Sequence, residues 1–249
     1  VVEHARTRGL AVMTVGEQGE AIRLVNREPT QLGQSLTVEH AGQERTIDLP
    51  LIGAYQVSNA LTAAGLALAT GTEASRVWDA VARLQPVRGR LERAAIAPSG
   101  APIYVDYAHT PDAIAAAVAA LRPHVSGRLI TVFGAGGDRD PGKRAPMGAA
   151  AAKASDVVIV TDDNPRGEDP ADIRRQVLEG APQAREIGGR REAILAAIAE
   201  AGAEDIVLVA GKGHETGQII GSGDNMRVLP FDDVDVAREC VAEIARGAA

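Results

Sequence analysis

Aromatic residues make up only 2 % of this 249-residue chain, which has one Trp, three Tyr and two Phe. Proteins that bind single-stranded nucleic acid stack the bases on such rings, and a formal net charge of -7 would repel a polyanion. We therefore expect no nucleic-acid partner and no attraction to an anionic membrane surface. The hydrophobic fraction of 45 % is ordinary for a globular protein, so the core should rest on aliphatic side chains.

Cys240 is the only cysteine, so the chain cannot form an intrachain disulfide. This usage fits a reducing compartment and predicts a cytoplasmic location, with Cys240 as a small apolar residue on a helix face. No stretch approaches the roughly 20 apolar residues of a spanning helix, and no signal peptide is recognisable, so no membrane span is expected. The chain does not begin with Met, which indicates that it starts inside a larger protein.

Several catalytic motifs are also missing. No G-x-x-x-x-G-K-[ST] occurs, and Gly134 and Gly136 are followed by Arg139 where G-x-G-x-x-G requires glycine. H-E-x-x-H, paired Cys/His spacings and G-x-S-x-G are absent as well. The sequence therefore predicts neither a phosphate loop nor a metal site, and no catalytic residue is assigned within this chain.

The first part of the chain has the pattern of short strands followed by two helices. Strands are expected over 10–15, 21–25, 35–40 and 44–49, with Ala41-Gly42 as a hairpin turn. One helix should cover 58–70 and stop at Gly71. The next should be capped by Thr72, with one apolar face formed by Val77, Trp78, Val81 and Leu84.

Strands and helices alternate after Pro86-Val87-Arg88-Gly89, the expected domain boundary. Short, continuous and mainly apolar runs indicate strands buried on both faces, as in a parallel sheet; they are 103–106, 129–133, 157–161 and 206–210. Helices are expected from the Asp169 cap and Pro170 to Gly180, and over 191–201 and 232–247. This alternation predicts an α/β fold with a Rossmann-like, doubly wound, mostly parallel sheet over 88–249, preceded by a separate unit over 1–87.

Polar or glycine-rich loops follow the four predicted strands. Ligands of open α/β sheets bind at the carboxyl ends of the strands, so these loops should form a composite site for a small zwitterionic ligand. The loops are residues 106–112, 134–140, 161–166 and 211–216. Gly136-Gly137 fits either a tight turn with positive φ or a close approach to a ligand.

Asp163-Asn164-Pro165-Arg166 is the sharpest local signal. Pro165 restricts the backbone, so Asp163 and Arg166 should project from a rigid loop. The arginine could grip a carboxylate with two hydrogen bonds and the aspartate could accept from an ammonium group. A helix-entry turn with a solvated ion pair is the alternative, and spacing alone favours it. His109 and His214 are interpreted as turn or capping residues.

In combination, these motifs resemble the Mur ligase family of ATP-dependent ligases, and within it the members that add meso-diaminopimelate. The similarity covers about residues 47 to 235. It is carried, in the family's order, by Leu49-Pro50-Leu51-Ile52-Gly53 with Asn59, Gly89-Arg90-Leu91-Glu92, Asp106-Tyr107-Ala108-His109-Thr110-Pro111, Gly136-Gly137-Asp138-Arg139-Asp140, Asp163-Asn164-Pro165-Arg166 and Gly211-Lys212-Gly213-His214-Glu215.

The resemblance implies an enzyme of peptidoglycan synthesis. It implies that ATP, with Mg²⁺, activates a carboxylate of a UDP-MurNAc-dipeptide as an acyl phosphate, which the amine of meso-diaminopimelate then attacks. Residues 1–87 would be the C-terminal part of a central ATP-binding domain without its phosphate loop, and residues 88–249 an amino-acid-binding domain. The chain by itself is then expected to be inactive.

The same resemblance assigns residues to ligands. It implies that meso-diaminopimelate contacts Arg139, Asp163, Asn164, Pro165, Arg166, Gly211 and Glu215, with Arg166 at the distal carboxylate. Asn59, Arg90 and Asp106 would contact the nucleotide. Three alternatives remain open: a lysine-adding Mur ligase, a folate–glutamate ligase, and a non-catalytic module that binds a small molecule.

Overall fold

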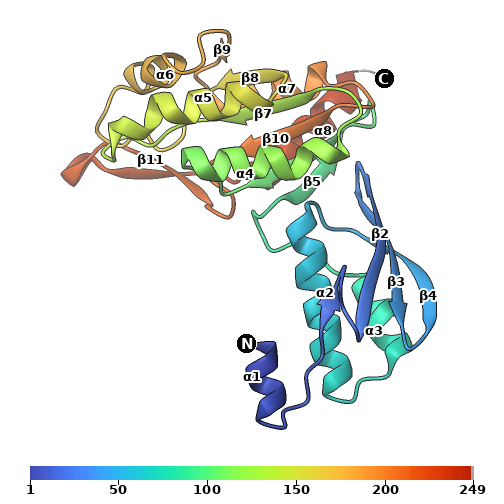
Figure 1. Ribbon diagram of the computed structural model, residues 1–249. Helices are drawn as coiled ribbons and strands as arrows, with labels where there is room; N and C mark the ends of the chain where they lie inside the picture. Colours follow the sequence, from blue (N-terminus) through green and yellow to red (C-terminus); the bar gives the residue numbers. More distant parts are fainter. Residues whose placement is uncertain (248–249) are drawn as a thin grey trace. The chain divides into compact units, whose positions relative to one another are not determined.

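The computed structural model describes residues 1–247 and divides into two compact units, Val1–Gln85 and Pro86–Ala249 (Figure 1). The last two residues of the predicted C-terminal domain lie outside the described residues. The units are called the N-terminal and the C-terminal unit below. Which Mur ligase domain each one represents stays a prediction.

The N-terminal unit is a four-stranded sheet covered by helices. The strand order is β1-β2-β3-β4, with β2, β3 and β4 antiparallel. The elements are α1 (Val2–Thr7), β1 (Val15–Gly16), β2 (Ile22–Thr30), β3 (Gly33–His40), β4 (Gln43–Leu49), α2 (Ala54–Ala69) and α3 (Ala74–Val81). Apolar side chains that alternate along the strands meet the apolar faces of α2 and α3, and Trp78 is buried in this core.

The hairpin predicted in this unit is confirmed. Ala41 and Gly42 both have positive φ, 53° and 74°, as the favoured two-residue hairpin turns require. The strand predicted over 10–15 is wrong except at Val15, because residues 10–14 join no sheet. The strand predicted over 21–25 runs on to Thr30.

The helix boundaries differ from those predicted in this unit. α2 begins at Ala54 rather than at 58, since Gly53, with φ 92°, begins it without a side-chain cap. Thr72 does not cap α3, whose N-cap is Glu73. Leu84 lies beyond the helix end but still packs against the same core.

The C-terminal unit confirms the predicted doubly wound, mostly parallel sheet. Its strand order is β5-β6-β10-β7-β8-β9, with parallel pairing from β6 through β9 and antiparallel pairing of β5 with β6. The strands are β5 (Glu92–Ile96), β6 (Pro102–Asp106), β7 (Leu129–Phe133), β8 (Val157–Val160), β9 (Arg185–Glu186) and β10 (Ile206–Ala210). β7 and β10 are buried along their whole length, which explains their continuous apolar sequences.

Helices cover both faces of this sheet. α4 (Pro111–Leu121), α5 (Arg144–Ala154) and α6 (Pro170–Leu178) pack in a row on one face, and α7 (Arg190–Glu200) and α8 (Asp233–Gly247) on the other (Figure 1). The predicted Asp169 cap is confirmed, because its carboxylate accepts a hydrogen bond from the backbone of Ala171 and Pro170 is the first helical residue. α7 and α8 each begin within one residue of the prediction.

A two-stranded hairpin, β11 (Gly217–Ile220) and β12 (Arg227–Pro230), was not predicted. It joins the unit through backbone hydrogen bonds on both sides of Arg166, to Ile219 and Gly221. Within the described residues, no helix is both long and apolar enough to cross a membrane.

Candidate functional site

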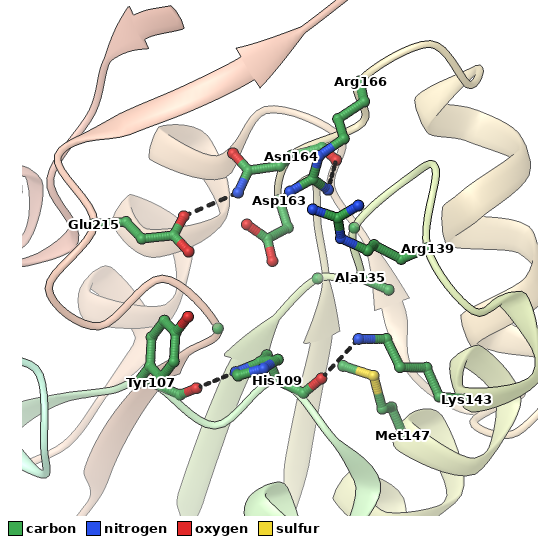
Figure 2. A pocket seen from close by; sticks show the side chains of 13 residues that line it. Tyr107, His109, Ala135, Arg139, Lys143, Met147, Asp163, Asn164, Arg166 and Glu215 are labelled. Atoms are coloured by element: carbon green, nitrogen blue, oxygen red, sulfur yellow. Dashed lines mark hydrogen bonds between the residues drawn. The ribbon is translucent and has the colours of Figure 1, made fainter.

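A cavity of about 310 Å³ opens at the carboxyl ends of β6, β7, β8 and β10, where the predicted loops meet (Figure 2). Its lining is Tyr107, His109, Gly134, Ala135, Gly136, Arg139, Lys143, Met147, Asp163, Asn164, Arg166, Gly211 and Glu215. It therefore brings together every residue predicted for meso-diaminopimelate except Pro165. Their contact with that ligand stays a prediction.

One side of the cavity is acidic. Asp163 is only 6 % exposed, and its Oδ1 has no hydrogen-bond partner among the described residues. The nearest cation is the ammonium of Lys212, 3.4 Å away. A buried oxygen without a partner is costly unless a donor arrives from elsewhere. Asp163 and Glu215 together are therefore suited to accept hydrogen bonds from a ligand's ammonium group.

The opposite side of the cavity is basic. The side chains of Arg139 and Arg166 flank Gly136: a Cβ there would lie 2.9 Å from Nη1 of Arg166 and 4.0 Å from Cγ of Arg139. Arg166 donates from Nη1 to the carbonyls of Gly137 and Asn164, and Arg139 donates to the carbonyl of Asp138. Within the described part of the chain neither arginine has a carboxylate partner. The remaining nitrogens are available to a carboxylate.

Arg166 adopts a backbone conformation that is uncommon for a residue with a side chain, with φ 51°. Backbone pairing with β11 holds it there, since its N–H donates to Ile219 and its carbonyl accepts from Gly221. This conformation aims the guanidinium across the loop toward Gly137. The expected ion pair between Asp163 and Arg166 does not form, so the alternative of a solvated helix-entry pair is wrong.

The glycines of the β7 loop are needed for close packing. A Cβ on Gly137 would overlap the carbonyl oxygen of Pro165, and one on Gly134 would overlap that of Thr161. Neither Gly136 nor Gly137 has positive φ, so the tight-turn interpretation is wrong. The absence of side chains lets the two loops that carry Arg139 and Arg166 lie against each other.

A buried arginine connects the loop after β7, which carries Arg139, to the segment after β8, which carries Arg166. Arg144, which is 1 % exposed, donates to both carboxylate oxygens of Glu168 at 2.8 Å and to the carbonyl of Gly136 at 3.2 Å. The hydrogen bond from Arg144 and one from the backbone of Asp138 hold the pKa of Glu168 below its usual value. The basic side of the cavity is therefore preorganised.

Tyr107 and His109 form a third wall, after β6. The ring of Tyr107 contacts His109 at 4.6 Å and His214 at 4.9 Å between centroids, and Arg90 lies over it at 4.9 Å. Nδ1 of His109 lies 2.8 Å from the carbonyl of Tyr107, so this nitrogen carries the proton. Lys143 donates to the carbonyl of His109 and points into the cavity (Figure 2).

The residues predicted to contact the nucleotide do not line this cavity. Asp106 accepts hydrogen bonds from the backbone of Leu91 and Ala108, at 2.8 and 2.9 Å, and burial raises its pKa. Arg90 lies on the ring of Tyr107. Asn59 is on α2 in the N-terminal unit, where it donates to Gln56. Their role at a nucleotide stays a prediction.

Sequence patterns missed several residues of the site, namely Tyr107, His109, Lys143, Met147 and the fully buried Lys212. Tyr107 and His109 lie in the loop 106–112, which was predicted to face the site, so their place in the sequence could have identified them. Lys143 and Met147 carried no such signal, because they lie on the turn η2 (Pro141–Lys143) and on α5.

No group of three or more His, Cys, Asp or Glu side chains within residues 1–247 is arranged to hold a metal ion. The cavity instead combines acceptors on one side with arginines on the other. Such groups, held on an α/β scaffold, are suited to a molecule that carries both an ammonium and a carboxylate.

Comparison with known proteins identifies the class of this scaffold. Residues 89–213 match the family described as Mur ligase, glutamate ligase domain. The chain belongs to the Mur ligase family.

Individual proteins within this family are also similar to the chain. The chain is 62 % identical over 241 residues to the UDP-N-acetylmuramoyl-L-alanyl-D-glutamate–2,6-diaminopimelate ligase of Zymomonas mobilis, covering 97 % of the chain and 50 % of that protein. It is 54 % identical over 230 residues to the ligase of the same name from Caulobacter vibrioides, covering 92 % and 46 %. A solved structure of a ligase with this name superposes with a TM-score of 0.79 at 34 % identity, covering 97 % of the chain and 50 % of that structure. The chain thus spans about half the length of the curated relatives it matches.

Proposed function

We propose that this chain is the C-terminal part of a ligase that adds meso-diaminopimelate to UDP-MurNAc-L-Ala-D-Glu (a MurE-type enzyme), and that the cavity binds the incoming amino acid. The observation that carries the proposal is a buried carboxylate, Asp163, whose Oδ1 accepts no hydrogen bond, across the cavity from two arginines that lack carboxylate partners among the described residues. The names of the relatives support the same substrate.

The two sides of the cavity suggest how the ligand would be oriented. One end of meso-diaminopimelate carries an ammonium and a carboxylate that take no part in the new bond. Its ammonium would lie between Asp163 and Glu215, and its carboxylate would meet Arg166 and Arg139. L-lysine has no distal carboxylate, so it would leave these arginines unpaired, which favours the diaminopimelate-adding enzyme over the lysine-adding alternative.

The rest of the reaction is part of the same proposal. ATP would convert a carboxylate of the UDP-linked dipeptide into an acyl phosphate, and the free amine of the bound amino acid would attack its carbonyl carbon with loss of phosphate. Mg²⁺ would be bound together with the ATP phosphates in the complete ligase. The role of this cavity is then to position the amine. A cytoplasmic location belongs to the proposal as well.

Calorimetry on the 249-residue chain tests the ligand assignment. Meso-diaminopimelate should bind, L-lysine should bind about tenfold or more weakly because it lacks one charge-assisted hydrogen-bonding group, and L-glutamate should not compete. Equal binding of lysine and diaminopimelate would favour the lysine-adding alternative. Preferred binding of glutamate would favour a folate–glutamate ligase.

A further inference from the structure

Lys212 is fully buried behind the acidic side of the cavity, with its side chain 0 % exposed. Its ammonium donates to Oδ1 of Asn164 and to the carbonyl of Gly217, both at 2.8 Å. It also lies 3.4 Å from a carboxylate oxygen of Asp163 and 3.4 Å from one of Glu215. Burying an ammonium is costly unless it is paired and hydrogen-bonded, and here three of its four contacts are with residues that line the cavity, namely Asp163, Asn164 and Glu215.

Lys212 is one of three groups that fix which way the side-chain amide of Asn164 faces. An ammonium group can only donate, so the atom of Asn164 that it contacts must be the oxygen. The same oxygen accepts from the backbone of Ile219 at 2.9 Å, and Nδ2 donates to Glu215 at 2.9 Å. Asn164 therefore has one N–H left for the cavity and acts there as a donor.

Lys212 also sets the charge of this side of the site. The other buried cation nearby, Arg190, is already neutralised by Asp233, since its Nε and Nη2 lie 2.8 and 2.7 Å from the two carboxylate oxygens. Lys212 is shared by Asp163 and Glu215. Two carboxylates and one ammonium leave a net charge of -1, which one ligand ammonium balances.

We propose that Lys212 is a positioning residue that makes this pocket selective for a ligand end with one ammonium and one adjacent carboxylate, chiefly by halving the charge of the Asp163–Glu215 pair and also by helping to hold Asn164 as a donor. The inference rests on the proposed function, because it concerns how the same pocket chooses its amino acid. Lys212 itself does not line the cavity, so it acts through Asn164, Asp163 and Glu215.

Replacing Lys212 by Met tests both effects with little change in shape. The acidic side then carries a net charge of -2, and the oxygen of Asn164 keeps only the hydrogen bond from the backbone of Ile219. Meso-diaminopimelate, which has no net charge near pH 7, should bind about tenfold or more weakly. L-lysine, with a net charge of +1, should lose much less or gain. The preference for diaminopimelate over lysine should therefore fall by about tenfold or more.

A second substitution supplies the rescue. Glu215→Gln in the Lys212→Met background returns the net charge to -1, the value in the unmodified chain, so the preference for diaminopimelate should recover to within about threefold of that of the unmodified chain. A role for Lys212 in packing alone would lower the melting temperature without changing which of the two amino acids is preferred. In the complete ligase, Lys212→Met should raise KM for diaminopimelate and leave KM for ATP unchanged.

Arg128→Met is the matched control, because Arg128 pairs with Asp205 at the opposite, amino-terminal end of β7 and β10. It should leave the preference between the two amino acids unchanged. If Lys212→Met does not fold, Asn164→Asp gives the second measurement, since it also adds one negative charge and removes the donor with almost no change in volume. Calorimetry on the unmodified chain is done first.

The outcomes separate the two proposals. Failure of the unmodified chain to bind meso-diaminopimelate would overturn the proposed function and this inference with it. Normal binding by the unmodified chain, combined with an unchanged preference in Lys212→Met or in Asn164→Asp, would overturn this inference and leave the proposed function standing. A fall in preference together with recovery by Glu215→Gln supports it.

Discussion

Arg190 and Asp233 form a bidentate ion pair, and neither side chain is exposed to solvent. The same guanidinium donates to the carbonyl of Ala210 at 3.0 Å and to that of Asp162 at 3.3 Å. It therefore connects the start of α8 to the ends of β10 and β8, which lead into the loops of the cavity.

Asp233→Asn should strongly destabilise the C-terminal unit. The variant leaves the buried guanidinium of Arg190 without a counter-charge, and breaking a buried pair in this way costs about 3–5 kcal/mol. Denaturant unfolding of the chain measures the change. Arg191→Met is the control, because Arg191 pairs with Glu243 on the surface and should matter little. Equal stability of the two variants would mean that the buried pair does not hold these elements together.

Arg166→Ala should raise KM for meso-diaminopimelate by about tenfold or more in the complete ligase, since a hydrogen bond to a charged group contributes roughly 1.5–3 kcal/mol. KM for ATP should change little. The backbone bonds of residue 166 to β11 do not need the side chain, so the loop should keep its shape. Arg175→Ala, an exposed arginine on α6, serves as the control. A normal KM for the amino acid would remove Arg166 from the binding site.

Acid should weaken the contact between Glu168 and Arg144. The hydrogen bond from Arg144 lowers the pKa of Glu168 from its ordinary value of 4.5. A carboxylate with a lowered folded-state pKa stabilises the protein above its unfolded-state pKa, and this contribution is lost as the pH falls through the folded-state value. The free energy of unfolding, measured at a series of pH values from 6 to 3, should therefore fall more steeply for the original chain than for Glu168→Gln. The same pH dependence in both proteins would show that the Glu168–Arg144 pair does not contribute to stability.

Much of the C-terminal fold could be predicted because its central strands are buried on both faces. The strands 129–133 and 206–210 have the predicted bounds, since a run of apolar residues between polar loops leaves little freedom in where the strand ends. The hairpin β11–β12 could not be found in this way, because every residue of β12 is exposed. The start of α2 was missed because Gly53 carries no capping side chain.

The sequence predicted only those parts of the site whose positions follow from the parallel order of the strands. Loops after parallel strands meet at one edge, which brought Asp163 and Glu215 together as expected. The burial of Lys212 depends on contacts with β11, including its bond to Gly217, and a lysine between two glycines gives no sign of burial in the sequence. Asp106 turns toward the backbone of Leu91 beside β5, a strand that was not predicted.

The 249-residue chain should not release phosphate from ATP when it is supplied with Mg²⁺, the UDP-linked dipeptide and meso-diaminopimelate. Nucleotide phosphates are usually held by backbone N–H groups and cations of a glycine-rich loop; no such pattern occurs in the sequence, and residues 1–247 hold no cluster for a metal ion. A phosphate-release assay, with the complete ligase as the positive control, measures this. The same preparation should still bind the free amino acid in the calorimeter, which separates a folded binding unit from an inactive, unfolded one. Turnover comparable to that of the complete ligase would show that this chain carries its own phosphate-binding groups, and the assignment of its N-terminal unit would be wrong.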